Sequence, residues 1–297
     1  MPELPEVETI VRGLRTVLPG HTITSVRLGK TDFIEDPAAV GELLPGRRIE
    51  SVERMGKFIR LALSAGPAAK NPERQMDLIV HLGMTGWLGV RRPEDPVAPH
   101  THAFFELEDG RELRYTDIRR FGQMLIVAGD EMSAFGERLG KEPLEISASE
   151  FNERLAGRRA RIKALLLDQS VFRGLGNIYA DESLWQARLH PARLAAGLNS
   201  RELGRLRKAI RRVLLRAIED RGSSISDFVD AEGQPGEYQQ RHRAYGREGK
   251  PCFRCGTKIR RAIVAGRSSF FCPRCQGAPR RRRAVRRRSP KLSETRK

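Results

Sequence analysis

The feature that most restricts the fold of this chain is a pair of cysteine hooks close to its C-terminus. Cys252-x2-Cys255 and Cys272-x2-Cys275 stand sixteen residues apart and use all four cysteines of the sequence. Zinc prefers a tetrahedron of thiolates, and each hook supplies two ligands from one tight turn. So short a unit has too little core to fold without its metal. We therefore expect a zinc finger with one structural Zn²⁺, because a closed four-cysteine site leaves no coordination position for catalysis.

The cysteine count and the N-terminal residues also bear on the location of the protein. No cysteine remains for a disulfide elsewhere, which fits a reducing compartment. The N-terminus lacks a basic-then-apolar signal pattern, and no run of about eighteen apolar residues occurs. We expect a cytoplasmic protein without a membrane partner, and its 297 residues suggest about two domains.

A strongly basic charge balance points to a polyanionic partner. The net charge is +18 and the pI is near 10.6, which favours nucleic acid first and an anionic membrane second. Residues 278–297 carry eight arginines and two lysines against one glutamate, which is half of that charge. This tail is expected to be disordered and to raise DNA affinity without sequence preference. A solvated tail without a specific role is the alternative.

Two kinds of pattern divide the rest of the chain. Residues from about 22 to 128 are rich in β-branched and aliphatic side chains, with a hairpin signal at Asp109-Gly110, which is typical of an antiparallel sandwich or barrel. Residues 145–222 have apolar positions at helical spacing, and a capping box begins at Ser147. The expected fold class is therefore α+β. The strand runs are 22–28, 47–63, 76–90 and 122–127, and the helical runs are 147–166, 177–189 and 200–217.

The first residues combine an ordinary helix with an unusual terminus. Pro5 suits the first turn of a helix over residues 4–18, and Glu6 suits its positive end. Small residues after an initiator methionine favour its removal, so Pro2 is expected to become the N-terminus. The pKa of such an α-amine lies some units below that of a lysine, and its attack on an aldehyde-like carbon gives an iminium ion. Glu3 follows as a candidate proton donor. A plain capped helix is the alternative, and the two interpretations are compatible.

Four motifs occur in an order that resembles one protein family. They are M-P-E-L-P-E-V-E at 1–8, R-Y-T-D-I-R-R-F-G at 114–122, G-L-G-N-I-Y-A-D-E at 174–182 and the terminal four-cysteine finger. Together they closely resemble the bacterial formamidopyrimidine-DNA glycosylases, which remove oxidised purines from DNA, over residues 1 to about 276. The resemblance implies an N-terminal helix plus an antiparallel β-sandwich, a helix–two-turn–helix domain and the zinc finger, with DNA in the cleft between. The implied divisions are 1–133, 145–237, 238–277 and the tail 278–297.

The resemblance also implies a bifunctional activity in base excision repair, with base excision followed by β,δ-elimination at the abasic site. Pro2 is implied as the nucleophile on C1′ of the damaged nucleotide, and Glu3 as the acid that assists opening of the sugar. Lys57 matches the lysine implicated in catalysis and phosphate contact, and Arg267 matches the finger arginine associated with the final elimination. The implied partner is double-stranded DNA that contains oxidised purines, such as 8-oxoguanine and formamidopyrimidines, or abasic sites, bound by a monomer.

A further set of positions is implied to bind DNA. Met84, Arg119 and Phe121 resemble the residues that fill the gap left by the flipped nucleotide, and residues 223–238 resemble the loop over the everted base. Flipping costs a few kcal/mol, which an apolar wedge and an inserted cation offset. Core packing is the alternative for Met84 and Phe121, and a solvated face is the alternative for Arg267. The positions that resemble backbone-binding residues are His100, Arg158, Lys163 and Asn177.

Two positions have support that does not depend on the resemblance. Lys57 shares the parity of the apolar residues that end the run 47–63, so strand alternation places it on the inward-facing row unless a bulge at Gly56 intervenes. Gly176 and Asn177 stand at an expected helix start, where glycine permits close approach and free amides bind phosphate. A plain turn between helices is the alternative there.

Two other functions fit part of the sequence. The sister glycosylases that act on oxidised pyrimidines share the fold and nucleophile, but their start resembles P-E-G-P-E, whereas this chain has P-E-L-P-E. A non-catalytic DNA-binding protein would use the finger and the tail, but it has no need for Pro2 beside Glu3. The purine-specific enzyme is the interpretation that accounts for all of these features.

Overall fold

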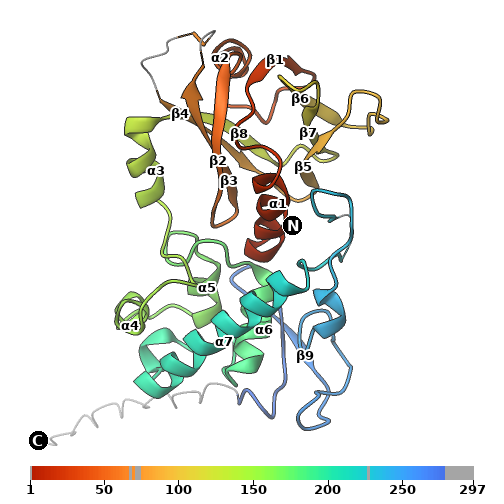
Figure 1. Cartoon of the computed structure of the whole chain (residues 1–297). Helices are drawn as coiled ribbons and strands as arrows, with labels where there is room; N and C mark the ends of the chain where they lie inside the picture. The colour runs from red at the N-terminus through yellow and green to blue at the C-terminus, as the bar shows by residue number, and fades with distance from the viewer. Residues whose placement is uncertain (1, 67–68, 71–74, 226–227, 278–297) are drawn as a thin grey trace, which may run out of the picture.

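Two four-stranded sheets pack face to face in the N-terminal half of the chain (Figure 1). Their strand orders are β1-β6-β7-β5 and β2-β3-β4-β8, and every pairing is antiparallel. The structure, a computed structural model, describes residues 2–66, 69–70, 75–225 and 228–277, so the expected disordered tail lies outside the described residues. The strands are β1 (Ile23–Leu28), β2 (Arg47–Met55), β3 (Phe58–Ala65), β4 (Met76–His81), β5 (Gly86–Arg91), β6 (Thr101–Leu107), β7 (Glu112–Asp117) and β8 (Gln123–Ala128).

The sandwich core forms because alternate residues of its strands point inward. In β3, Ile59, Leu61 and Leu63 are buried while their neighbours are partly exposed. Two of the expected strand runs are interrupted. The run 47–63 turns back between β2 and β3, and the run 76–90 divides into β4 and β5, which belong to different sheets. Glycines stand at both breaks, Gly56 in the first run and Gly83 in the second, and apolar composition alone does not register them.

Helix α1 (Leu4–Arg15) packs against both the sandwich and the helical half of the molecule. Val7, Ile10 and Leu14 are buried in the sandwich core, as their helical spacing predicts. Helix α2 (Pro37–Leu43) is absent from the sequence prediction because its seven residues are too few to show a helical period. Residues at its start stabilise the helix instead. The Asp36 carboxylate caps it by accepting a hydrogen bond from the Ala39 N–H at 2.9 Å, and Pro37 occupies the first turn.

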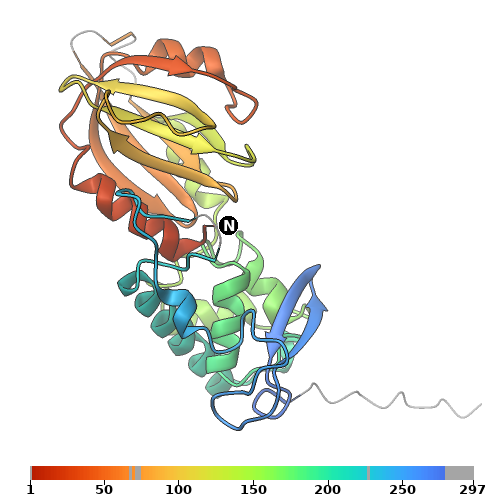
Figure 2. The same ribbon diagram turned by 90° about the vertical axis from the view of Figure 1, so that its right-hand side faces the viewer.

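Helix α6 (Asn177–Gln186) lies at the centre of the C-terminal half. Helix α7 (Ser200–Glu219) packs on one side of it and strand β10 (Arg267–Phe271) on the other (Figure 2), so α6 is buried along nearly its whole length. Capping boxes at Ser147, as predicted, and at Asn199 start α4 and α7. The other helices are α3 (Met132–Glu137), α4 (Ala148–Leu155), α5 (Ile162–Leu167) and α7 (Ser200–Glu219), with 3₁₀ turns η1 (Gly129–Glu131), η2 (Ala195–Gly197) and η3 (Tyr238–Arg241).

The zinc-finger segment forms a hairpin of β9 (Arg260–Val264) and β10 (Arg267–Phe271). Ala265 and Gly266 join the strands with φ of 52° and 70°, the left-handed pair that a two-residue hairpin turn requires. Trp185 of α6 is buried together with Cys252 and Cys272 in a small separate core, which seats the finger on α6. Within the described ranges, no helix is long and apolar enough to cross a membrane.

Candidate active site and zinc centre

The beginning of the chain is fixed to the N-terminus of α6. The two carboxylate oxygens of Glu3 accept hydrogen bonds from the Ile178 N–H at 2.9 Å and the Tyr179 N–H at 3.3 Å. These are amides of the first turn of α6, which have no partner within the helix. The Leu4 N–H donates to the carbonyl of Gly174 at 3.0 Å. Pro2 and Glu3 are therefore held, both buried, between the sandwich and the helical half.

Two glycines make this close approach possible. A Cβ atom on Gly176 would lie 2.5 Å from Oε1 of Glu3, and one on Gly174, whose φ is +91°, would lie 2.8 Å from the side chain of Leu4. The close approach expected at this helix start is confirmed. The partner of the Ile178 and Tyr179 amides differs from the expected phosphate, because the Glu3 carboxylate already occupies both.

Lys57 lies beside Glu3, but in a turn and not in a strand. The pair Gly56-Lys57 joins β2 to β3, with Gly56 at φ +64°, so the predicted inward-facing strand row does not extend to Lys57. Its side chain is nevertheless buried, with 7% exposed. Burial lowers the pKa of Lys57, and so does the nearby charge of Arg267, while Glu3 and Glu6 act in the opposite direction.

Lys57 is thus coupled electrostatically to two other candidate catalytic residues, Glu3 and Arg267. Burial raises the pKa of Glu3 above its ordinary value, against the opposing effects of Lys57 and of the two α6 amides. Arg267 occupies the first position of β10, at the exposed end of the finger hairpin, and from there its charge acts on Lys57. The structure therefore brings Glu3, Lys57 and Arg267 together from positions far apart in the sequence, with Pro2 adjacent to Glu3.

Glu6 is a member of the site that the sequence did not single out. Its carboxylate accepts hydrogen bonds from the N–H of Glu3 at 2.8 Å, the N–H of Ser223 at 2.7 Å and the hydroxyl of Tyr179. Burial and the neighbouring Glu3 raise the pKa of Glu6 to about 7. The sequence identified Glu6 only as an acidic residue in the first turn of a helix, because two of its three partners, Tyr179 and Ser223, lie more than 170 residues away.

The segment after α7 extends the network from Glu6. The Ser223 hydroxyl lies 3.1 Å from Nε2 of His242, whose pKa burial lowers to about 4. Further along, the carbonyl of Asp230 accepts a hydrogen bond from Trp87 Nε1 at 2.7 Å, and Ala231 is buried in the sandwich core. The expected long loop 223–238 therefore bridges the two halves of the molecule; residues 226–227 lie outside the described part.

The three expected wedge residues lie on two adjoining loops of the sandwich. Met84 and Phe121 expose 40% and 56% of their surface, which argues against core packing, and Cζ of Arg119 stands 4.5 Å above the Phe121 ring. The buried Asp117 fixes this loop, because its carboxylate accepts hydrogen bonds from the Gly122 N–H at 2.9 Å and the Thr85 hydroxyl at 2.5 Å. The sequence did not assign this supporting role.

The four expected backbone-binding residues have different surroundings. His100 and Arg158 are exposed, and His100 has a φ of +66°. Asn177 occupies the first position of α6 and its side chain interacts with Tyr245. Lys163 is different: its side chain is fully buried, and Nζ lies 2.7 Å from Oδ1 of Asp181 and 2.9 Å from the carbonyl of Ser268.

Lys163 therefore ties the finger to the helices in this structure. Asp181 completes the connection by accepting a hydrogen bond from the Phe270 N–H at 2.8 Å. An ammonium held in this way has no exposed face for a phosphate, which argues against the expected direct contact in this conformation. No sequence signal indicated the pairing, because the two residues are eighteen positions apart and belong to different helices, α5 and α6.

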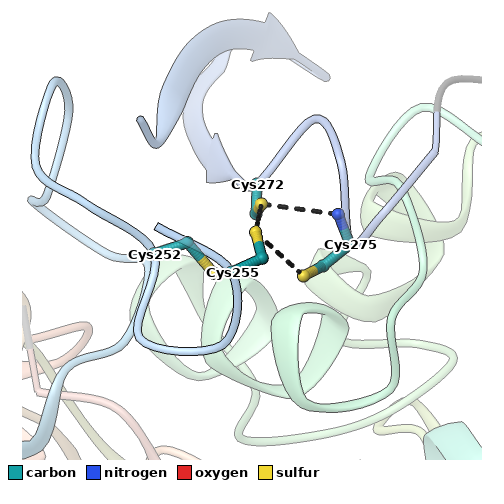
Figure 3. Close-up of side chains that lie close together, drawn as sticks. All are labelled: Cys252, Cys255, Cys272 and Cys275. Atoms are coloured by element: carbon teal, nitrogen blue, oxygen red, sulfur yellow. Dashed lines mark hydrogen bonds between the residues drawn. The ribbon is translucent and has the colours of Figure 1, made fainter. Parts of the chain in front are cut away.

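The four cysteines converge as the hook spacing predicts (Figure 3). Their Sγ atoms all lie within 4.8 Å of one another, and Sγ of Cys255 is 3.5 Å from those of Cys272 and Cys275. Thiolates on a tetrahedral zinc ion, each at about 2.3 Å, have sulfur neighbours about 3.8 Å apart. Cys252, Cys255, Cys272 and Cys275 thus fit one structural Zn²⁺.

Known protein families match the chain along most of its length. The family model for the formamidopyrimidine-DNA glycosylase N-terminal domain matches residues 1–124, the model for the formamidopyrimidine-DNA glycosylase H2TH domain matches 139–229, and the zinc finger found in FPG and IleRS matches 249–277. A formamidopyrimidine-DNA glycosylase from Pelotomaculum thermopropionicum is 46% identical over 282 residues, which are 93% of this chain and 99% of the relative.

Solved structures agree with this similarity. A mutant of Lactococcus lactis FPG in complex with Fapy-dG-containing DNA has a TM-score of 0.84 at 32% identity, and the complex of Lactococcus lactis Fpg with abasic-site DNA has a TM-score of 0.83 at the same identity. Both comparisons cover 93% of this chain and 100% of the solved chain.

Proposed function

The chain belongs to the formamidopyrimidine-DNA glycosylase family and is a bifunctional DNA glycosylase and abasic-site lyase that repairs oxidised purines, and from this premise we propose how its own residues act. The nucleophile is the secondary amine of Pro2 after removal of Met1. The observation that carries the proposal is that the carboxylate of Glu3, the residue that follows Pro2, is fixed by two amides of the first turn of α6.

Base excision begins when the Pro2 nitrogen forms a bond to C1′ of the damaged nucleotide and the bond from C1′ to the base breaks. The proton of the attacking amine passes to the departing base. Glu3 then gives its proton to O4′, so that the C1′–O4′ bond breaks and the nitrogen lone pair forms the iminium. A raised pKa suits Glu3 to this task, because it keeps more of the carboxyl protonated at a given pH. The iminium then permits β,δ-elimination of the flanking phosphates.

Lys57 and Arg267 bind the phosphates on either side of the reacting sugar, with Asn177 beside them. Two cations close to a developing phosphate leaving group stabilise its charge. Lys57 is held by a hairpin of the sandwich and Arg267 by the finger hairpin, so both halves of the molecule contribute. His100 and Arg158, both exposed, contact the DNA backbone further from the lesion.

The partner is double-stranded DNA with an oxidised purine or an abasic site, bound by a monomer. Met84 and Phe121 enter the space of the flipped nucleotide, and Arg119 bonds to the orphaned base. The loop 223–238 covers the everted base. Lys163 acts as a positioning residue, because its contacts hold the hairpin that carries Arg267.

We further propose the divisions 1–133, 145–237 and 238–277, followed by a basic tail at 278–297. The first division ends inside α3 (Met132–Glu137), which connects the two halves. The protein works in a bacterial cytoplasm, associated with the nucleoid through its affinity for DNA.

The substitution Glu3→Gln tests the assignment of the acid. We expect loss of base excision from 8-oxoguanine duplexes, but retention of cleavage at preformed abasic sites. The reason is that an abasic sugar already exists partly as the open aldehyde and does not need O4′ protonation. Gel assays of both substrates under single-turnover conditions measure the two rates.

The exposed Glu53 offers a matched control, because Glu53→Gln removes the same charge from a surface outside the site. Equal loss of both activities in Glu3→Gln would assign Glu3 a structural role. A preference for thymine glycol over 8-oxoguanine in the unaltered enzyme would favour the sister class instead.

A further inference from the structure

Helix α7 carries a stripe of cations on its exposed side. Arg201, Arg205, Lys208 and Arg212 are all exposed, while the apolar residues between them are buried against α4 and α6. Their spacings of four, three and four residues place them on one face of the helix, separated by about 6, 4.5 and 6 Å of helix rise. The stripe is therefore a nearly straight row of positive charge.

Helix stability does not account for this row. Arg201 stands in the first turn of α7, where the helix dipole disfavours a cation. Within the described part of the chain, the side chains of Arg201, Lys208 and Arg212 make no hydrogen bond or ion pair. Like charges along one face also repel one another. These three side chains are thus free to meet an external anion.

The row borders a continuous groove. Two adjoining cavities of about 450 and 510 Å³ share Gln186 and Arg212 as lining residues. The first cavity has no acidic residue in its lining. The second has only Glu182, whose carboxylate already accepts hydrogen bonds from the N–H groups of Ala244 and Tyr245 at 2.8 and 2.9 Å. The other cations of the second cavity are Arg216, Arg241, Arg243 and Arg254.

The α7 groove, defined by the two cavities, borders α7 on the side of α6 opposite to the finger hairpin. Helix α6 lies between α7 and the finger hairpin that carries Arg267, and Figure 2 shows α7 and the hairpin at opposite edges of the helical half. A DNA segment in the cleft therefore leaves the groove accessible.

We propose that the α7 groove binds the sugar-phosphate backbone of a second DNA duplex while the cleft holds the first. A duplex presents about one negative charge per 1.7 Å of its axis, so a straight row of guanidinium and ammonium groups meets several phosphates along one strand. A folded protein partner fits less well, because protein interfaces depend on buried apolar anchors, whereas half of the residues that line the groove are cations and one is acidic. Bridging two duplexes lets the enzyme pass from one DNA segment to another without a free intermediate.

A two-duplex binding experiment with the full-length enzyme tests this proposal. The cleft is first filled with a duplex that contains a tetrahydrofuran abasic analogue and a first fluorophore. An undamaged duplex with a second fluorophore is then added, and its anisotropy reports binding while the first fluorophore reports that the cleft stays occupied. The test variant is Lys208→Gln with Arg212→Gln. The matched control is Lys70→Gln with Arg138→Gln, which removes the same charges from exposed positions outside the groove.

We expect the test variant to bind the second duplex about tenfold more weakly than the control, with a salt slope lower by about two. Single-turnover excision from one duplex should stay unchanged in both variants, which shows that the cleft is intact. The basic tail is present in every protein, so its contribution cancels. Equal affinities of the two variants, or failure of a second duplex to bind, would overturn the proposal. Stronger competition by a polyglutamate peptide than by a duplex of equal charge would assign the groove to an acidic protein instead.

Discussion

At the scale of single residues, the active site depends on buried carboxyl groups with raised pKa values. Glu3 and Glu6 lie one helical turn apart and are nearly inaccessible to solvent; burial raises the pKa of both, and the charge of Glu3 raises that of Glu6 further. Each carboxyl is fixed by donors from the helical half, at Ile178 and Tyr179 or at Ser223. The catalytic end of the chain is therefore rigid although it is a terminus.

The raised pKa of Glu6 predicts a pH-dependent stability. Because the folded-state pKa is about 7 against an ordinary 4.5, the folded protein retains a proton that the unfolded chain loses as the pH rises between these values. The group therefore stabilises the fold most below pH 4.5, and its contribution falls by about 3 kcal/mol as the pH rises to 7. The substitution Glu6→Gln removes this titration. Its stability deficit, measured by urea unfolding, should shrink by that amount between pH 4.5 and 7; a constant deficit would contradict the assignment.

The role of a residue could be predicted from the sequence where it depends on neighbouring residues, and not where it depends on contacts with distant parts of the chain. The spacing of the four cysteines and the Pro2-Glu3 pair were readable in the sequence. The capping of α6 by Glu3 was not, since the two lie 175 residues apart. The alternation of strand residues predicted that Lys57 faces inward. Lys57 is indeed buried, but it lies in the turn between β2 and β3 and not in a strand.

At the scale of elements, one buried ion pair joins the finger hairpin to the helices. Lys163 and Asp181 are almost completely buried and together hold both Ser268 and Phe270 of β10. Removing one partner leaves the other charge buried and uncompensated, which costs about 3–5 kcal/mol. We therefore expect Lys163→Met to destabilise the helical half by this amount in thermal or urea unfolding.

The double variant Lys163→Met with Asp181→Asn supplies the control. It removes both charges, and the asparagine carbonyl still accepts the Phe270 N–H, so most of the lost stability should return. A double variant as unstable as Lys163→Met would show that the pair is not the source of the loss.

The zinc centre provides a second prediction at this scale. Removing Zn²⁺ should release the hairpin that carries Arg267, because the four thiols are the main link within the finger. DNA binding and strand cleavage should both weaken, while the sandwich keeps its own core and stays folded. Anisotropy and circular dichroism before and after chelation measure the two effects. Unchanged DNA binding after verified metal removal would refute the role of the finger.

Most elements could be predicted from periodicity, but not where they break. The capping box at Ser147 and the apolar face of α7 identified two helices. Gly83 and Gly86 stand where the run 76–90 divides between two sheets, but glycines do not say which sheet each part joins, and the seven residues of α2 are too few to give a periodic signal.

At the scale of the whole molecule, the two halves meet around the N-terminus of the chain. Helix α1 packs against the sandwich and α7, and the segment after α7 returns to the sandwich through Asp230 and Ala231. The reacting end of the protein thus lies where both halves contribute charges, from Lys57 on one side and Arg267 on the other. The motif order in the sequence identified the parts, whereas their convergence required the fold.

Covalent trapping tests the central claim, that the amine of Pro2 is the nucleophile. Borohydride reduces an iminium to a stable amine, so the processed enzyme should form a covalent adduct with abasic-site DNA on a denaturing gel. Pro2→Gly should lose most of this adduct. A variant that keeps Met1 because an N-terminal extension precedes it should form no adduct. Removing the extension together with Met1, which exposes the amine of Pro2, should restore the adduct. Equal trapping by the Met1-retaining protein would show that another amine of this chain performs the reaction.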